Sequence, residues 1–260
     1  MESHAERVRH AFSEQAGAFE DARHNHLFTD EARWLFDGLA CGEQDLLLDV
    51  AAGTGHAARA LAPRVRAALA IDITPEMLEA GRRAATQAGV ANVVFLQGDA
   101  EALPFLDGSF DVVVCRFALH HIQRPQAVVG EMARCLRAGG RLGVADMVAE
   151  EDPEIAAAQN AVERMRESSH TQMLRVSELE GLLAAAGMRD IAAEAREVRR
   201  PLQPWLEHAK TPPQQADAVR ALVEAELAGG APSGLAPRRE ADGSLTFRQR
   251  WASVLGVAPG

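Results

Sequence analysis

Three acidic residues stand where an apolar, strand-like run gives way to a loop. Asp49 lies within LLLDVAAGTGH, Asp72 within ALAIDITPEML and Asp99 within LQGDAEALPF. In an open parallel sheet the carboxyl ends of neighbouring strands meet at one edge, and ligands bind there. Carboxylates gathered at that edge would suit a ligand that offers hydroxyl groups, an amine or a positive charge.

The turn after the first acid is built from small residues. Ala51, Gly53 and Gly55 form an A-x-G-x-G pattern ahead of a predicted helix. Glycine permits positive φ angles and close approach of a ligand, which the free N–H groups of a helix N-terminus would face. The dinucleotide fingerprint needs a further glycine where this chain has Ala58. Asp49 would also repel a pyrophosphate, so a cationic, adenosine-containing ligand fits better.

The spacing of the second acid is typical of a ribose contact. Asp72 lies 19 residues after Gly53, and an acid about 20 residues after a glycine turn commonly binds ribose hydroxyls. After the third strand, Asp99 could accept a hydrogen bond from the exocyclic amine of adenine. The backbone N–H of Ala100 could donate to the adenine ring.

Two further strand ends carry groups suited to proton transfer. CRFALHHI places Arg116, His120 and His121 after the fourth strand, and VADMV places Asp146 in the fifth. Histidine has an unperturbed pKa suited to a general base, and a neighbouring carboxylate could orient its ring and stabilise its protonated form. Either histidine could be the base or have a structural role. His170 could cap a helix end or face a substrate.

Other candidate chemistry has less support. Cys115 lies in a strand-like run, where a cysteine usually serves as a small apolar residue. His24 and His26 have no third ligand at a suitable spacing, so we expect no metal. The three cysteines are widely spaced, which predicts neither a disulfide framework nor a zinc site.

The composition is that of an ordinary globular protein. The 260 residues are 47% apolar and 25% charged, with a formal net charge of -10. This acidic balance argues against a nucleic-acid partner. No apolar run reaches the ~18 residues of a membrane helix, and the charged N-terminus lacks a signal-peptide core. We therefore expect a cytoplasmic protein with no membrane partner.

Strands and helices alternate in the part of the chain that carries these motifs. Helices are predicted to begin near Gly55, Pro75 and Pro125, which is typical of right-handed β-α-β units and a parallel sheet. The predicted strands span residues 46–51, 67–71, 93–96, 110–115 and 141–148.

Helices and a last strand are predicted on either side of this core. Apolar spacing predicts a helix over residues 2–20, and Thr29 could cap a second one. A capping box from Ser177 to Glu180 would open a helix that ends near Gly187. Beyond residue 150 we expect helices over 151–170 and 212–230, strands over 189–198 and 244–257, and a mobile loop over 229–238.

In order and spacing, these motifs resemble those of class I S-adenosylmethionine-dependent methyltransferases. The resemblance rests on LLLDVAAGTGH, ALAIDITPEML, LQGDAEALPFLDGSFDVVVCRFALHHI and CLRAGGRLGVADMV, and it extends over about residues 8–190. Within this class, the chain resembles the UbiE-like family, which is related to quinone-biosynthesis methyltransferases. The resemblance implies a Rossmann-like α/β fold, a mostly parallel twisted sheet with helices on both faces, and S-adenosylmethionine as cofactor.

The resemblance also implies roles for residues. Asp49 and the backbone of Gly53 and Gly55 would hold the methionine end of the cofactor, and the backbone near Arg116 its ammonium group. Ala51 departs from the pattern, because many members have glycine there. The complete set implied for the cofactor is Asp49, Ala51, Gly53, Thr54, Gly55, Asp72, Ile73, Met77, Asp99, Ala100 and Arg116. The set implied for catalysis is His120, His121 and Asp146.

By the same resemblance, residues 1–260 form a single domain. Its parts would be a helical lid over 1–42 with Phe12 and Phe19, a cofactor-binding core over 43–150, helical substrate-side additions over 151–243 and a final strand over 244–260. The implied reaction is O- or C-methylation of a small molecule, in secondary-metabolite or quinone-like biosynthesis. A cofactor-binding protein with another reaction, and a protein or RNA methyltransferase, remain alternatives. A homodimer is compatible with the sequence.

Overall fold

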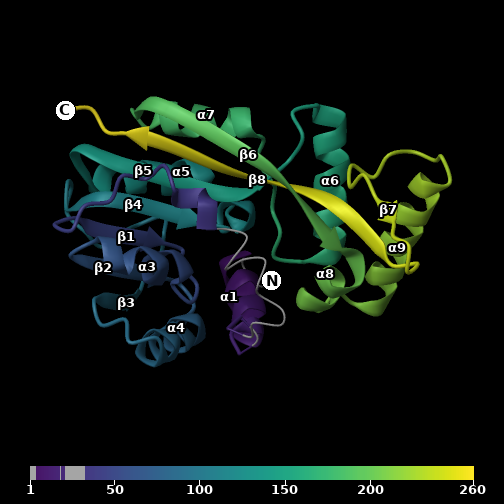
Figure 1. Ribbon diagram of the computed structural model, residues 1–260, viewed down its shortest axis with the longest axis horizontal. Coiled ribbons are helices and arrows are strands. Elements are labelled where there is room, and N and C mark those ends of the chain that lie inside the picture. The colour runs from purple at the N-terminus through teal and green to yellow at the C-terminus, as the bar shows by residue number, and fades with distance from the viewer. Residues whose placement is uncertain (1–3, 18, 21–32) are drawn as a thin grey trace.

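The computed structural model describes residues 4–17, 19–20 and 33–260 of the chain. Its centre is an eight-stranded sheet in the order β3-β2-β1-β4-β5-β8-β6, and β7 pairs with β8 outside this path (Figure 1). The strands are β1 (Leu46–Val50), β2 (Ala67–Asp72), β3 (Val93–Gln97), β4 (Phe110–Arg116), β5 (Leu136–Val148), β6 (Arg189–Pro201), β7 (Arg238–Arg239) and β8 (Leu245–Val257).

The sheet is parallel from β3 to β5 and antiparallel at its other edge. Strands β1 to β5 pair in parallel, as crossover connections between them require. Strand β8 inserts between β5 and β6 and is antiparallel to both. The mostly parallel α/β fold expected from the sequence is confirmed. The insertion of the last strand between two earlier ones is an addition that apolar patterning cannot predict.

Several helices begin at a residue that favours a first turn. Proline occupies the first turn of α4, α5, α6 and α9, where its missing N–H has no intrahelical partner to lose. The described helices are α1 (His4–Gln15), α3 (His56–Leu61), α4 (Pro75–Gln87), α5 (Pro125–Cys135), α6 (Pro153–Arg166), α7 (Val176–Ala185), α8 (Leu202–His208) and α9 (Pro213–Leu227), with 3-10 turns η1 (Arg33–Phe36), η2 (Ala62–Arg64) and η3 (Leu119–His121). Among the described residues, none of these helices has the length and apolar character needed to cross a membrane.

The side chains of alternate strand residues pack into two apolar clusters, one on each face of the sheet. Leu47 and Val112 pack in the cluster that contains residues of η1, α3 and α4. Leu48 and Val113 pack in the cluster that contains residues of α5 and α7. Cys115 belongs to this second cluster, in agreement with its predicted role as a small apolar residue.

A third apolar cluster lies beyond the sheet. It joins α6, α8 and α9 to the start of β8, and Trp205 and Phe247 are its largest side chains. Farther along β8, Trp251 packs in the cluster with α3 and α4, and Val254 packs in the cluster with α5 and α7. One strand therefore contributes to all three clusters. Figure 1 shows β6 and β8 extending beyond the parallel strands of the sheet toward α6, α8 and α9.

The capping box at the start of α7 differs from the prediction. The helix begins at Val176, and the backbone N–H of Arg175 donates to Oε2 of Glu178 at 2.8 Å. The hydroxyl of Ser177 instead donates to Glu151 at 2.6 Å. The predicted box from Ser177 to Glu180 is therefore wrong, because Glu178 is the acid that lies one turn from the free N–H.

Other boundaries also differ from those expected. Helix α1 ends at Gln15 rather than at residue 20, and β5 begins at Leu136 rather than at residue 141. Helix α8 was not expected, and Thr29 lies outside the described residues. Within the 229–238 stretch, Leu235 is buried, and the side chain of Gln159 in α6 donates to the carbonyl of Gly234 at 2.8 Å.

Candidate active site

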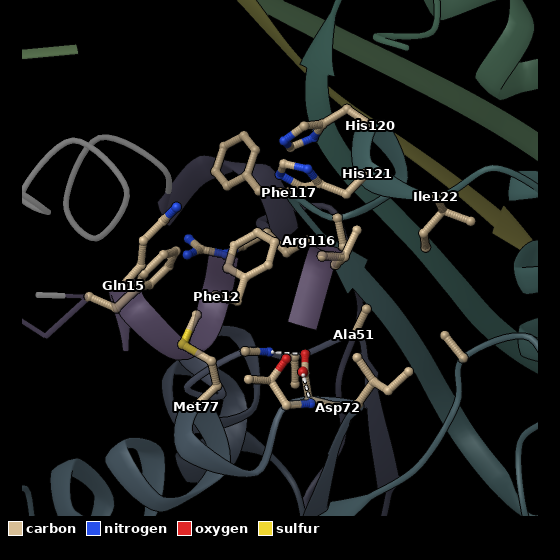
Figure 2. Close-up of a pocket in the computed structure, with 18 of the residues that line it drawn as sticks. Phe12, Gln15, Ala51, Asp72, Met77, Arg116, Phe117, His120, His121 and Ile122 are labelled. Carbon is tan, nitrogen blue, oxygen red and sulfur yellow. Dashed lines mark hydrogen bonds between the residues drawn. The ribbon is translucent and has the colours of Figure 1, made fainter. Parts of the chain in front are cut away.

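A cavity of about 400 Å³ lies beyond the carboxyl ends of β1, β2 and β4. It includes the point where the strand order reverses between β1 and β4, which is where open α/β sheets bind ligands. Figure 2 shows Ala51 and Asp72 on one side of it and His120 and His121 on the other, with Arg116 between them. From the predicted set, the lining contains Ala51, Gly53, Thr54, Asp72, Ile73, Met77, Asp99, Ala100, Arg116, His120 and His121.

The small-residue turn lies in the left-handed backbone region. The φ angles of Ala51, Gly53 and Gly55 are 51°, 56° and 72°, which explains the glycines and implies strain at Ala51. A Cβ at Gly55 would lie 2.8 Å from the Phe95 ring, so this glycine also permits close packing. Gly55 itself lies outside the cavity lining and precedes the first turn of α3.

The carboxylate of Asp72 is fixed by two backbone N–H groups. Its Oδ2 accepts from Gly53 at 2.7 Å and its Oδ1 accepts from Thr74 at 2.8 Å. Burial raises the pKa of Asp72, and these hydrogen bonds oppose the rise. Each oxygen can still accept another hydrogen bond. Two adjacent hydroxyl groups, such as those of a ribose, are suitable donors.

Asp99 and Ala100 lie beside Asp72 in the cavity lining. One oxygen of Asp99 accepts from the backbone N–H of Glu101 at 2.9 Å, which holds the loop after β3. The second oxygen is available to a ligand amine. The adenine contact expected from the sequence stays a prediction, and Met77 and Ile73 line the same cavity.

Asp49 is set behind the cavity lining. It is 1% exposed, and its Oδ2 accepts from the N–H of Ala58 in α3 at 2.8 Å. Its Oδ1 has no hydrogen-bond partner among the described residues. Burial raises the pKa of Asp49 to about 7, while the N–H of Ala58 and the charge of Arg116 lower it. The sequence predicted a direct contact of Asp49 with the cofactor, but Asp49 is not part of the cavity wall. Its charge could still act on a bound cation.

Arg116 lies at the end of β4 and lines the cavity. Burial lowers its pKa to about 10, although the nearby charge of Asp49 opposes this change. The guanidinium carbon lies 5.1 Å from the ring centroid of Phe117. Phe117 has a φ of 50°, which is rare for a bulky residue, and its ring meets Trp251 edge-on at 4.9 Å.

His120 forms a buried pair with Asp146. Its Nδ1 lies 2.6 Å from Oδ1 of Asp146, and its backbone N–H donates to Oδ2 at 3.2 Å. Burial would lower the pKa of His120, but the charge and the hydrogen bond of Asp146 outweigh it and raise the pKa. With Nδ1–H donated to Asp146, the neutral ring has its lone pair on Nε2. His120 lines the cavity and Asp146 stands behind it.

His121 and His170 have different surroundings. The ring centroid of His121 lies 4.0 Å from that of His120, and its Nδ1 lies 3.2 Å from Oγ of Ser169. Burial and the neighbouring His120 lower the pKa of His121 to about 4. His170 lies outside the cavity lining, where its Nε2 is 3.0 Å from Oδ1 of Asn160.

Sequence reasoning missed the charged residues at the far end of the cavity. They come from α6, the loop after it, β6 and α8, and they are Arg166, Glu167, Arg200 and His208. The guanidinium of Arg166 donates to Glu163 at 2.7 Å and to Glu167 at 2.6 Å. It also lies over the Trp205 ring at 4.8 Å. The sequence offers no signal for this cluster, because residues 150 to 245 contain no recognisable motif.

No metal site is found within the part of the chain that the structure describes. No three or more His, Cys, Asp or Glu residues there are arranged to hold an ion. His24 and His26 lie outside that part.

Comparison with known proteins identifies the family. A family described as "Methyltransferase domain" matches residues 48–144. The "Uncharacterized methyltransferase YcgJ" of Bacillus subtilis is 40% identical over 145 residues, which are 56% of this chain and 57% of that protein. The "Uncharacterized protein YafE" of Escherichia coli is 32% identical over 161 residues, 61% of this chain and 77% of that protein. The chain belongs to the class I S-adenosylmethionine-dependent methyltransferases.

Two further similarities agree with membership of this methyltransferase family. The "Ubiquinone/menaquinone biosynthesis C-methyltransferase UbiE" of Roseobacter denitrificans is 41% identical over 113 residues, 42% of this chain and 45% of that protein. The crystal structure of YcgJ matches with a TM-score of 0.77 and 28% identity, covering 92% of this chain and 99% of the other. In sequence, this methyltransferase matches about half the length of YcgJ and of UbiE.

The cavity suits the cofactor of these methyltransferases, S-adenosylmethionine. Asp72 and Asp99 retain acceptor positions for hydroxyl and amine groups, and Gly53 opens the turn to a ligand. The buried Oδ1 of Asp49 has no hydrogen-bond partner among the described residues, and a cation bound near the turn would favour the charged form of this carboxyl. The expected family and cofactor are thus confirmed, while the role of each residue stays a prediction.

Proposed function

We propose that this methyltransferase methylates a small molecule at a hydroxyl oxygen or an activated carbon. One observation carries the proposal. A single cavity is lined by the acids at the carboxyl ends of β2 and β3 and by His120 beyond β4, whose ring pairs with Asp146 of β5. A nucleoside-binding end and a base therefore border the same space. The curated relatives with assigned substrates include quinone-biosynthesis C-methyltransferases, which supports a small acceptor.

The nucleoside end would hold the cofactor through polar contacts. Asp72 would accept from the ribose hydroxyls, and Asp99 with the N–H of Ala100 would bind adenine. The turn at Gly53 and the end of β4 at Arg116 would border the methionine portion. When bound, S-adenosylmethionine supplies an electrophilic methyl group. The main contribution of the protein is then to hold the acceptor in line and to exclude water.

His120 is better suited than His121 to remove a proton from the acceptor. Its Nδ1–H bond to Asp146 fixes the tautomer and leaves Nε2 to accept the proton. The same carboxylate stabilises the imidazolium that forms. The pKa of His121 is lowered to about 4, because burial and His120 disfavour its charge. His121 would then be a poor proton acceptor and would shape the cavity wall.

Helix α1, with Phe19 shortly after its end, would close the cavity over the acceptor. The Phe12 ring meets His121 edge-on at 4.9 Å, and the Phe19 ring lies 5.8 Å from the His208 ring. These apolar side chains line the cavity together with Val8. Their position supports the lid predicted from the sequence, because an apolar cover keeps water away from the reacting groups.

Calorimetry and product analysis test the proposal. S-adenosylhomocysteine should bind at micromolar protein concentration, whereas NADH should not. Incubation with labelled S-adenosylmethionine and a cell extract, followed by mass spectrometry, should reveal a labelled small molecule. Tight NADH binding without S-adenosylhomocysteine binding would reject the cofactor assignment. Label found only in protein or RNA would reject a small-molecule acceptor.

A further inference from the structure

The short turn that carries the proposed base is held by hydrogen bonds to its carbonyl groups. The carbonyl of His120 accepts from the N–H and the hydroxyl of Thr171, both at 2.8 Å. The same hydroxyl oxygen lies 3.1 Å from the carbonyl oxygen of Ile122, so its one proton is shared between the two carbonyls. Between them, the carbonyl of His121 lies 2.6 Å from Nε2 of His4. Thr171 belongs to the loop before α7, whereas His4 belongs to α1.

Helix α1 also contacts the ring of the residue beside the base. The Phe12 and His121 rings meet edge-on, with an interplanar angle of 90° and centroids 4.9 Å apart. The His121 ring lies in turn against His120, at 4.0 Å between centroids. One helix therefore touches both the backbone and the side chain of His121. A change at His4 can reach His120 through this contact.

The rest of the attachment of α1 is mostly polar. Among its described side chains only Gln15 is buried. Ser13 donates to Glu76 of α4 at 2.8 Å, and Lys210 donates to the carbonyl of Glu14 at 3.2 Å. An element with few buried apolar contacts opens locally at a low cost in free energy. Each hydrogen bond that α1 makes therefore matters for its docked population.

We infer that His4 is a positioning residue for the proton-transfer step. Its hydrogen bond to the His121 carbonyl completes the support of the η3 turn and holds the His120 ring in the orientation that directs Nε2 to the acceptor. The turn is fully supported only when α1 is docked, so proton removal depends on closure of the lid. The inference rests on the proposed function, in which His120 is the base.

Several charged or titratable groups surround this turn. Asp146 pairs with His120, and Glu167 acts on both histidines through its charge. His170 lies 5.8 Å from His120 between ring centroids. A spectroscopic experiment must separate the effect of His4 from the effect of these groups, which the variants below leave unchanged.

Three variants on α1 test the inference. His4→Ala removes the hydrogen bond, and His4→Gln keeps a side-chain N–H that can donate to the carbonyl. His10→Ala is the matched control, because the His10 side chain is on the same helix and 71% exposed. Imidazole NMR signals of His120 and His121 are recorded with S-adenosylhomocysteine bound. Turnover is measured with the acceptor found in the extract experiment.

His4→Ala should shift the signals of His121 and His120 and lower kcat about 2- to 10-fold, the range for loss of one hydrogen bond. The acceptor KM and the S-adenosylhomocysteine Kd should stay within twofold of the parent values. His4→Gln should retain more than half of the parent kcat, and His10→Ala should match the parent.

Identical histidine spectra for His4→Ala and His10→Ala would overturn the inference. Where methyl transfer is observed, equal kcat values for His4→Ala and His10→Ala would also overturn the inference. Failure of the proposed function has a different signature, because the parent would then bind S-adenosylhomocysteine yet yield no labelled small molecule. The NMR comparison needs no turnover, so it reports on His4 in either case.

Discussion

Replacing Asp72 with alanine tests the nucleoside end of the cavity. The carboxylate accepts from the N–H groups of Gly53 and Thr74, and we expect its remaining lone pairs to accept from two ribose hydroxyls. A hydrogen bond to a charged group contributes roughly 1.5–3 kcal/mol. Loss of the two hydrogen bonds to the ribose hydroxyls, partly offset by hydrogen bonds to water, should weaken S-adenosylhomocysteine binding by at least about 2 kcal/mol. This free energy corresponds to about a 30-fold rise in Kd.

Titration calorimetry measures the affinity, and thermal melting without ligand reports on the turn that loses its acceptor. Asp217→Ala is the matched control, because it removes the same charge from an exposed side chain on α9. The control should bind S-adenosylhomocysteine as the parent does. If Asp72→Ala also binds within twofold of the parent, Asp72 does not contact the ribose, and the placement of the nucleoside is wrong.

Three further predictions concern the proposed base, Asp49 and the turn after β1. His120→Ala should lower kcat by about 10²–10⁴-fold with little change in S-adenosylhomocysteine affinity, and Asp146→Asn should lower kcat less. Because the pKa of His120 is raised above 6.5, the rate of the parent enzyme should rise with pH, with a midpoint above that value. A flat pH–rate profile from pH 5 to 8 would exclude His120 as the base. Burial raises the pKa of Asp49 to about 7, so ionisation of Asp49 opposes folding as pH rises. Asp49→Asn keeps an acceptor for the N–H of Ala58, and it should raise the Tm at pH 8 by about 2–4 °C yet weaken S-adenosylhomocysteine binding about tenfold. Unchanged affinity by calorimetry would restrict Asp49 to a structural role. Ala51→Gly should raise the Tm by about 1–3 °C, because it relieves a left-handed alanine at a smaller cost in chain entropy; a lower Tm would show that the methyl group contributes more than the strain it causes.

That Asp72 and Asp99 line one cavity could be predicted from the sequence, because both lie at the carboxyl ends of parallel strands. Asp72 ends one apolar run and Asp99 lies two residues past the end of β3, and strand order brings such positions to one edge of the sheet. Asp49 is different, because its place within β1 turns the side chain toward α3 and the N–H of Ala58. Periodicity identifies a strand but does not show which neighbour receives a polar side chain.

The acceptor end could not be predicted in the same way. Arg166 of α6 and Arg200 of β6 lie far apart in the sequence but line the same cavity, because α6 packs through the third apolar cluster on β8, the strand that pairs with β6. The choice between His120 and His121 also needs the fold. Both follow β4, and only the pairing of β4 with β5 places Asp146 next to His120.

Strand β8 gives the molecule a mechanical property beyond its role in the sheet. Phe247, Trp251 and Val254 anchor one continuous segment in three separate apolar clusters. The helical region at the acceptor end is therefore not a detachable module, because it cannot loosen without disturbing the strand that pairs with β5. Cooperative unfolding of both ends follows from this continuity. A chimaera that exchanges the acceptor region between relatives would need to bring its own β8, since the strand must match three cores at once.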